Sequence, residues 1–189
     1  MITEHQGLSN YLFDGLNYEK YIKDNALHDL VGVDLTAYGA VTAKQIKDPY
    51  HSVNPNLSEA FAPELDDLCR LHFLIVSRKA TTILEFGLGK STIIFNDALS
   101  RNRDNYEHFV KKNLRRSNHF ECHSVDNYEK WIDEVRSKNN LKCVRYHYSD
   151  LAMGTFNDRI CTYYSKMPNI CPDFIYLDGP DQFSPKGEI

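Results

Sequence analysis

The sequence lacks the cysteine pairs that build a disulfide framework or a zinc site. Its 189 residues include five cysteines, an odd number, and no two of them form a Cys-x-x-Cys pair. Disulfide-stabilised domains and structural zinc sites depend on such pairs. We therefore expect reduced thiols, the usual state in a cytoplasmic protein, at Cys69, Cys122, Cys143, Cys161 and Cys171.

A long apolar run and an excess of basic charge are also missing. No stretch of about 18 apolar residues is present, so we expect no membrane span. The start, "MITEHQGLSNYLFDG", lacks the basic and apolar segments of a signal peptide. The formal net charge of −4 disfavours nucleic acid as a partner. A basic cluster keeps that option open, although a solvated helix face is the simpler interpretation; it comprises Lys111, Lys112, Arg115 and Arg116.

What is present predicts an α/β fold. Hydrophobic residues make up 42% of the chain, enough for a packed core. Short β-branched or apolar runs alternate with helical patterns, which is typical of βαβ units around a parallel sheet. We therefore predict a Rossmann-like doubly wound parallel sheet. The expected strands lie in 81–87, 119–126, 142–149 and 172–180, and the expected helices in 63–79, 90–100 and 128–138.

The two ends of the chain carry weaker patterns. Residues 1–62 predict short helices and loops, an N-terminal extension that is a candidate substrate cap, and residues 63–189 carry the sheet. The fourth strand, "DFIYLD", has an apolar centre that would form an unprotected edge. Since a doubly wound sheet normally continues, we expect this one to be cut short after its fourth strand, as in a piece of a longer protein.

The stretch "LEFGLGKST", from Leu84 to Thr92, resembles two kinds of ligand loop. A phosphate loop needs G-x-x-x-x-G-K-[ST], and counting back five positions from Gly89 reaches Leu84 instead of glycine. The kinase or ATPase alternative therefore fits poorly, and the hydroxyls after Lys90 suit a helix cap. An NAD fingerprint, G-x-G-x-x-G, would need a third glycine where Thr92 stands.

Polar residues end each predicted strand. Glu85, Gly87 and Gly89 form a strand-to-helix turn, where glycine lets the backbone approach a ligand closely. Asp126 ends the second strand, and its carboxylate can accept from two ribose hydroxyls. Asp150 follows the third strand and Asp178 the fourth. In open α/β sheets ligands bind at these carboxyl ends.

Together these motifs resemble the class I S-adenosylmethionine-dependent methyltransferases. The features shared are E-x-G-x-G, an acid after strand two and D-x-I-x-L-D-G after strand four, over about residues 63–183. "FIYLDGPDQ" looks most like small-molecule O-methyltransferases, including those that modify sugars. Asp126 follows Gly89 by 37 positions, where about 20 is usual for a dinucleotide turn. We therefore expect residues 101–119 to be an insertion, a helix extension followed by a loop.

The resemblance implies a role for each matched residue. Glu85 would brace the glycine turn or bind the methionine amine, and Gly87 and Gly89 would lie under the cofactor. Asp126 would bind the ribose and Asp150 the adenine. Asp178 would orient the acceptor hydroxyl or bind Mg²⁺, with Asp181 and Gln182 nearby; its simpler role is to cap the following turn.

The expected function is methyl transfer from S-adenosylmethionine to a hydroxyl of a small molecule, with sugars among the candidate acceptors. Two alternatives stay open: a non-catalytic nucleoside-cofactor-binding or scaffold subunit, and an NAD-binding Rossmann protein. The partner would be a small molecule, and a homo-oligomer is compatible with this interpretation. His123 and His147 are expected to be polar fill, while Tyr163 and Tyr164 would line the acceptor pocket or cover the core.

Overall fold

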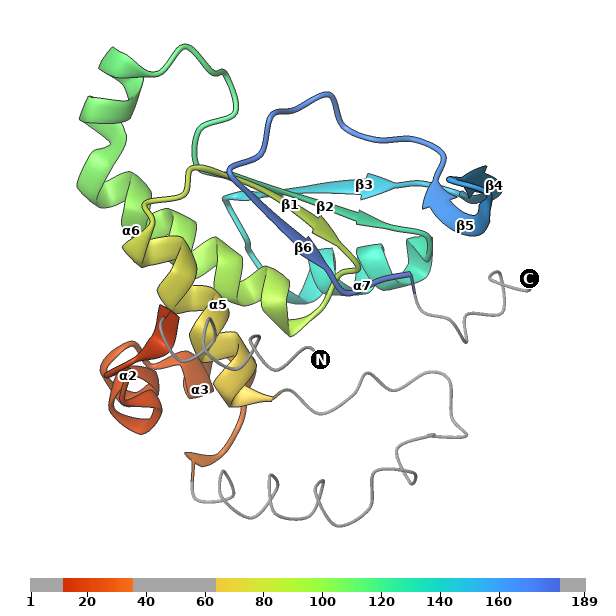
Figure 1. Cartoon of the computed structure of the whole chain (residues 1–189). Coiled ribbons are helices and arrows are strands. Elements are labelled where there is room, and N and C mark those ends of the chain that lie inside the picture. The colour runs from red at the N-terminus through yellow and green to blue at the C-terminus, as the bar shows by residue number, and fades with distance from the viewer. Residues whose placement is uncertain (1–11, 36–63, 181–189) are drawn as a thin grey trace, which may run out of the picture.

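A four-stranded parallel sheet forms the centre of the chain in the computed structural model, which describes residues 12–35 and 64–180 (Figure 1). Its strands lie in the order β3-β2-β1-β6. They are β1 (Thr82–Phe86), β2 (Glu121–Asp126), β3 (Val144–Tyr148) and β6 (Phe174–Leu177). The chain moves outward from β1 to β3 on one side and returns to the other side as β6. The predicted α/β, Rossmann-like sheet is therefore confirmed, with a topological switch point between β1 and β6.

Strand β1 is central, which explains its composition. It pairs in parallel with β2 on one edge and with β6 on the other. A strand covered on both edges and both faces reads as a continuous apolar or β-branched run. The one charged residue inside it, Glu85, is fully buried and pairs in register with Ser124 of β2.

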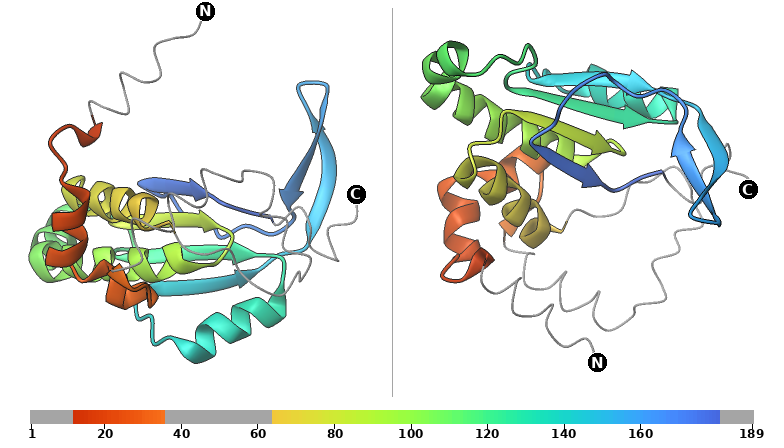
Figure 2. Two further views of the ribbon diagram at one scale, coloured as in Figure 1. Left: turned by 90° about the horizontal axis from the view of Figure 1, so that it is seen from below. Right: turned by 45° about the horizontal axis from the view of Figure 1, so that its top comes forward.

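Three helices lie on one face of the sheet, below it in Figure 1 and in front of it in the left view of Figure 2. They are α5 (Leu65–Ser77), α6 (Lys90–Asn113) and α7 (Glu129–Lys138). Helix α6 confirms the predicted helix extension, because it continues to Asn113 before a loop leads to β2. Ile83 of β1 and Ile94, Phe95 and Leu99 of α6 are completely buried between sheet and helix. None of the described helices is long and apolar enough to cross a membrane.

The described part of the N-terminal extension contains two short helices, as predicted. They are α2 (Tyr18–Asp24) and α3 (Leu27–Val31), which pack on α5 and α6. A buried chain of hydrogen bonds fastens them: Tyr21 Oη bonds His72 Nδ1 at 2.8 Å, and His72 Nε2 bonds Asp97 at 3.0 Å. Figure 1 shows α2 and α3 away from the carboxyl ends of the strands. The remaining residues of the predicted cap, 1–11 and 36–62, lie outside the described residues.

The second face of the sheet carries an antiparallel hairpin that the sequence analysis did not predict. It consists of β4 (Leu151–Phe156) and β5 (Arg159–Tyr164) and stands at the carboxyl side of the sheet. The connection from β5 to β6 then crosses this face (Figure 2, right). Within residues 12–35 and 64–180, β6 is paired on one side alone. Ile175 and Leu177 are 59% and 73% exposed, as expected for the predicted open edge.

Candidate functional site

The glycine turn after β1 touches the end of β6 backbone to backbone. Gly87 has φ +88°, a conformation that L side chains rarely adopt. A Cβ atom added to Gly87 would lie 2.8 Å from the carbonyl oxygen of Asp178. In the same way, a Cβ on Gly179 would lie 2.9 Å from Cα of Gly87. Two glycines are therefore required for this contact, which closes the switch point between β1 and β6.

Glu85 supports this turn from below. Its carboxylate is fully buried and accepts three hydroxyl hydrogen bonds, from Ser91 Oγ at 2.6 Å, Thr92 Oγ1 at 2.8 Å and Ser124 Oγ at 2.6 Å. Thr92 Oγ1 in turn accepts from the backbone N–H of Gly89 at 3.0 Å, the cap expected at the start of α6. Of the two expected roles, the geometry favours bracing the turn.

The environment of Glu85 also changes its acidity. Burial raises the pKa of Glu85 from 4.5 to about 7. The three hydroxyl donors act in the opposite direction, since they stabilise the ionised form, and the charge of Asp178 adds to the rise. The β1–α6 turn is therefore braced by a carboxyl group that titrates near neutral pH.

Asp126 joins the end of β2 to the same turn. It is 8% exposed, and its Oδ2 accepts from the backbone N–H of Leu88 at 3.0 Å while Oδ1 accepts from that of Tyr128 at 2.8 Å. Trp131 of α7 also binds this turn, because its Nε1 donates to the Leu88 carbonyl at 2.8 Å.

The other two predicted acids lie at the same edge but face different neighbours. Asp150 is exposed, and its Oδ1 accepts from Tyr148 Oη at 2.6 Å. No hydrogen bond between the described residues joins its carboxylate to Glu85, Asp126 or the glycine turn. Asp178 is exposed as well, and its backbone N–H donates to the Phe86 carbonyl at 2.9 Å.

Asp178 does not lie in a metal cluster within the described chain. No group of three or more His, Cys, Asp or Glu side chains in residues 12–35 and 64–180 is arranged to hold a metal ion. Mg²⁺ prefers six oxygen ligands in octahedral geometry, several of them often water. Asp181 and Gln182 lie outside the described residues. Binding of Mg²⁺ at Asp178 therefore stays a prediction.

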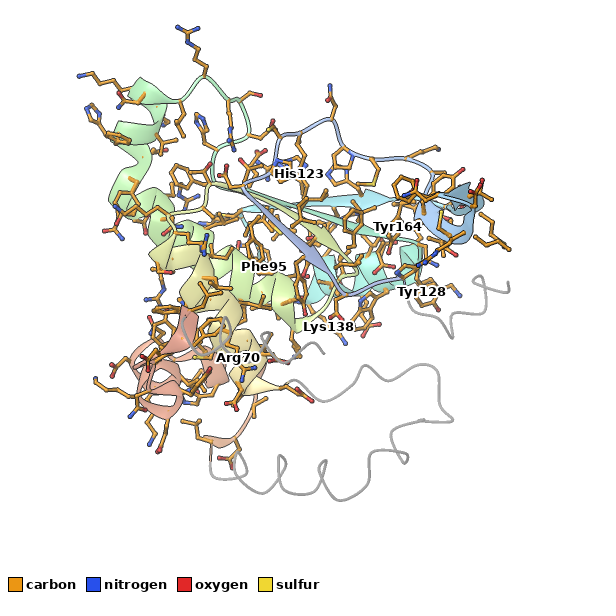
Figure 3. All side chains as sticks on the ribbon, in the orientation of Figure 1. Arg70, Phe95, His123, Tyr128, Lys138 and Tyr164 are labelled. Carbon is orange, nitrogen blue, oxygen red and sulfur yellow. The ribbon has the colours of Figure 1, made fainter. Side chains whose placement is uncertain are left out.

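Two buried side chains at this edge were not predicted as site residues. Tyr164, the last residue of β5, is 7% exposed, and its hydroxyl lies 3.1 Å from the position of a Cβ on Gly179. Asn127 follows Asp126 directly and is 5% exposed. Neither Tyr164 Oη nor Asn127 Nδ2 has a hydrogen-bond partner in the described structure. Figure 3 shows Tyr164 and Tyr128 at the carboxyl side of the molecule.

The histidines on the sheet have a structural explanation. His123 Nδ1 and His147 Nε2 are 3.0 Å apart across β2 and β3, and their rings stack. His123 Nε2 also lies 3.2 Å from Glu121, a residue that Arg145 pairs with at 2.7 Å. Burial and the neighbouring His123 lower the pKa of His147. These side chains fill the second face of the sheet with polar contacts, in keeping with the expectation.

The basic cluster does not lie at the carboxyl edge. Arg115 and Arg116 line a surface hollow of about 310 Å³ beside Thr82, at the amino end of β1. The charge of Arg116 is already engaged, because its guanidinium pairs with Asp173. Lys111 lies 2.8 Å from Glu107 on the exposed face of α6. The cluster therefore belongs to a solvated surface remote from the glycine turn.

The carboxyl edge thus combines a glycine turn with several acids. Gly87 and Gly179 meet at the switch point, a Cβ on Gly89 would meet nothing within 4 Å, and Asp126, Asp150 and Asp178 lie at the ends of the strands around them. Such an edge suits a ligand that carries hydroxyl or amine donors or a positive charge. No protein-family model, no curated protein and no solved structure matches this chain.

Proposed function

We propose that the protein binds S-adenosylmethionine at the β1–β6 switch point and transfers its methyl group to a hydroxyl of a small molecule. The observation that carries the proposal is the position of the glycine turn after β1. The turn contacts Asp126 at the end of β2 and Asp178 directly after β6. In open α/β sheets ligands bind at such a switch point, at the carboxyl ends of the strands.

Charge supports an adenosyl sulfonium over a phosphate-bearing nucleotide. S-adenosylmethionine carries a positive sulfonium and an amine, and both are attracted by the carboxylates of Asp126 and Asp178. The pyrophosphate of NAD or the triphosphate of ATP would meet repulsion from the same groups. Glu85, buried beneath the turn, does not offset this repulsion, because a carboxyl group carries no positive charge.

The chemistry assigns each residue a separate task. Asp126 accepts from the ribose hydroxyls, and Glu85 keeps the turn in place through Ser91, Thr92 and Ser124. Methyl transfer is an in-line displacement in which the sulfonium is already a good leaving group. Alignment of the two reactants at near-attack distance therefore supplies much of the rate. Asp178, exposed beside the turn, accepts the proton of the acceptor hydroxyl.

Calorimetry with S-adenosylhomocysteine, NAD and ATP–Mg, each titrated separately, tests the proposal. We expect binding of S-adenosylhomocysteine and none of ATP–Mg. Binding of NAD alone would support the NAD-binding alternative instead, and binding of ATP alone would contradict the proposal outright.

A substitution at Gly89 locates the bound ligand. A Cβ atom on Gly89 meets nothing within 4 Å, and its backbone is extended, so Gly89→Ala should keep the melting temperature of the wild type. If the cofactor lies against the turn, the added methyl group should weaken S-adenosylhomocysteine binding. Gly87→Ala is the contrasting variant: its φ of +88° and the contact with Asp178 should lower stability by roughly 1–3 kcal/mol. Normal affinity in Gly89→Ala would place the ligand elsewhere.

A further inference from the structure

Tyr164 reaches the switch point from an element outside the parallel sheet. It ends β5, where it pairs in register with Leu151 of β4. Its ring stacks on Phe86 at the end of β1, with centroids 5.5 Å apart and planes 22° apart. Leu84 and Val125 pack around it on the second face of the sheet. The hairpin therefore delivers one phenol group, in a fixed orientation, to the edge that holds the glycine turn (Figure 3).

The Tyr164 hydroxyl makes no contribution to the hydrogen bonding of the described structure. Tyr164 Oη is buried and has no hydrogen-bond partner in the described structure. A buried polar group without a partner destabilises the folded state, so phenylalanine would suit the packing better. Burial, with a contribution from the charge of Asp126, raises the pKa of Tyr164, which keeps the group a neutral O–H donor.

The surroundings indicate which kind of atom it would bind. The hydroxyl lies against Gly179, and the charge of Asp126 is close enough to raise its pKa. Carboxylates at Asp126 and Asp178 disfavour a second anion at this place. A sugar hydroxyl is neutral, can donate to Asp126 and can accept from a phenol at the same time. Because Tyr164 Oη is covered, binding of a sugar oxygen would require the backbone at Gly179 to shift.

We propose that Tyr164 is a ligand-binding residue whose O–H donates to a ribose oxygen of the bound nucleoside, opposite the carboxylate of Asp126. The inference rests on the proposed adenosyl site and adds to it a contact from the β4–β5 hairpin. Asn127 Nδ2, the other unpartnered buried donor at this edge among the described residues, is available to the same ligand.

The test compares Tyr164→Phe with Tyr163→Phe by calorimetry. Tyr163 is the matched control, since it is the preceding residue, is 49% exposed and lies on the opposite face of the hairpin, over Gly154. Tyr164→Phe should weaken S-adenosylhomocysteine and adenosine about tenfold each. It should leave adenine, which has no sugar, unchanged. Tyr163→Phe should bind all three probes like the wild type.

Stability supplies a second measurement. Loss of an unpartnered hydroxyl should leave the melting temperature of Tyr164→Phe equal to that of the wild type or higher. A clear fall would show that the hydroxyl has a structural partner and would overturn the inference, as would equal weakening of adenine. If the wild type binds S-adenosylhomocysteine and Tyr164→Phe binds it equally well, this inference alone is wrong. A wild type that binds none of the probes removes the proposed function as well.

Discussion

Glu85 makes the stability of the protein depend on pH near neutrality. Its pKa is about 7 in the folded chain and 4.5 as an unperturbed group, so the folded state holds more protons between these values. The free energy of unfolding therefore falls as pH rises from 4.5 to 7 and changes little above that. A shift of this size corresponds to roughly 3 kcal/mol. A pH rise through 7 thus ionises a carboxyl group directly beneath the proposed cofactor site.

Replacing Glu85 by glutamine should remove this slope. The amide keeps an oxygen for the hydroxyls of Ser91, Thr92 and Ser124 but does not titrate. Relative to the wild type, Glu85→Gln should gain stability between pH 4.5 and 8, measured by urea unfolding at several pH values. Glu134→Gln, on the exposed side of α7, is the matched control and should keep the wild-type slope. An unchanged slope in Glu85→Gln would mean that another group titrates there.

Asp126 holds two backbone N–H groups and is proposed to bind the ribose. Nucleoside analogues that lack the ribose hydroxyls distinguish the second role from the first. Asp126→Ala leaves the N–H groups of Leu88 and Tyr128 without their acceptor, so stability should fall. S-adenosylhomocysteine should bind roughly tenfold to a hundredfold more weakly. In calorimetry, wild type should prefer adenosine to 2′,3′-dideoxyadenosine, and Asp126→Ala should lose that preference. Asp133→Ala, exposed on α7, should bind normally. A preference retained in Asp126→Ala would assign the ribose to another residue.

At the scale of elements, Asp173 fixes β6 against β1. Its Oδ2 accepts from the N–H and hydroxyl of Thr81 at 2.9 and 2.7 Å, and Arg116 pairs with its other oxygen. Burial raises the pKa of Asp173, but the hydrogen bonds from Thr81 and the Arg116 guanidinium outweigh it, so the net pKa is below 3.8. This stabilisation is present above pH 3.8 and is lost as pH falls below that value.

Asp173→Ala should therefore loosen the strand that forms one wall of the switch point. We expect the free energy of unfolding at pH 7 to fall by roughly 2 kcal/mol, because hydrogen bonds to a charged group are lost while the site is partly exposed. The difference from wild type should shrink at pH 3. Urea unfolding at both pH values measures it, with Asp133→Ala as the control. A difference that persists at pH 3 would rule out the ionised carboxylate as its cause.

The elements differ in how well their sequences predict them. β1 and α6 were predicted because "TTILEFG" and the helical spacing after Lys90 are unambiguous. The β4–β5 hairpin was missed because its strands are largely exposed, so its apolar residues do not alternate regularly. A signal was available at Asn157 and Asp158, whose positive φ values form the two-residue turn. Such pairs favour tight hairpin turns.

The candidate site was predictable only where it depends on strand ends. Gly87, Asp126 and Asp178 follow strands that the sequence indicates, so their common edge could be predicted. The partners of Glu85 could not, because Ser124 meets it only through the register of β1 on β2. The same holds for Tyr164, whose position depends on the hairpin. Local pattern places residues on elements, whereas tertiary packing decides which side chains meet.

For the whole molecule, we expect cofactor binding to protect one edge and leave the other unchanged. At a hundredfold excess over its dissociation constant, S-adenosylhomocysteine should add about 2.7 kcal/mol of stability. That corresponds to a rise in melting temperature of roughly 5–10 °C. Hydrogen exchange should slow at residues 86–90, 126–128 and 178–179. The amides of α2 and α3 should exchange as before. Protection spread evenly over the chain would argue against a site at the carboxyl edge.

The contact between Gly87 and Gly179 has a consequence for how the protein is made. The two glycines lie far apart in the sequence, and among the described strands of the sheet β6 is the last in chain order. The βαβ units from β1 to β3 can assemble earlier, while the crevice lacks its second wall. Contacts of such long range form slowly because a large loop must close first. The contact between the two glycine turns therefore forms only after β6 has emerged, later than the βαβ units that precede it.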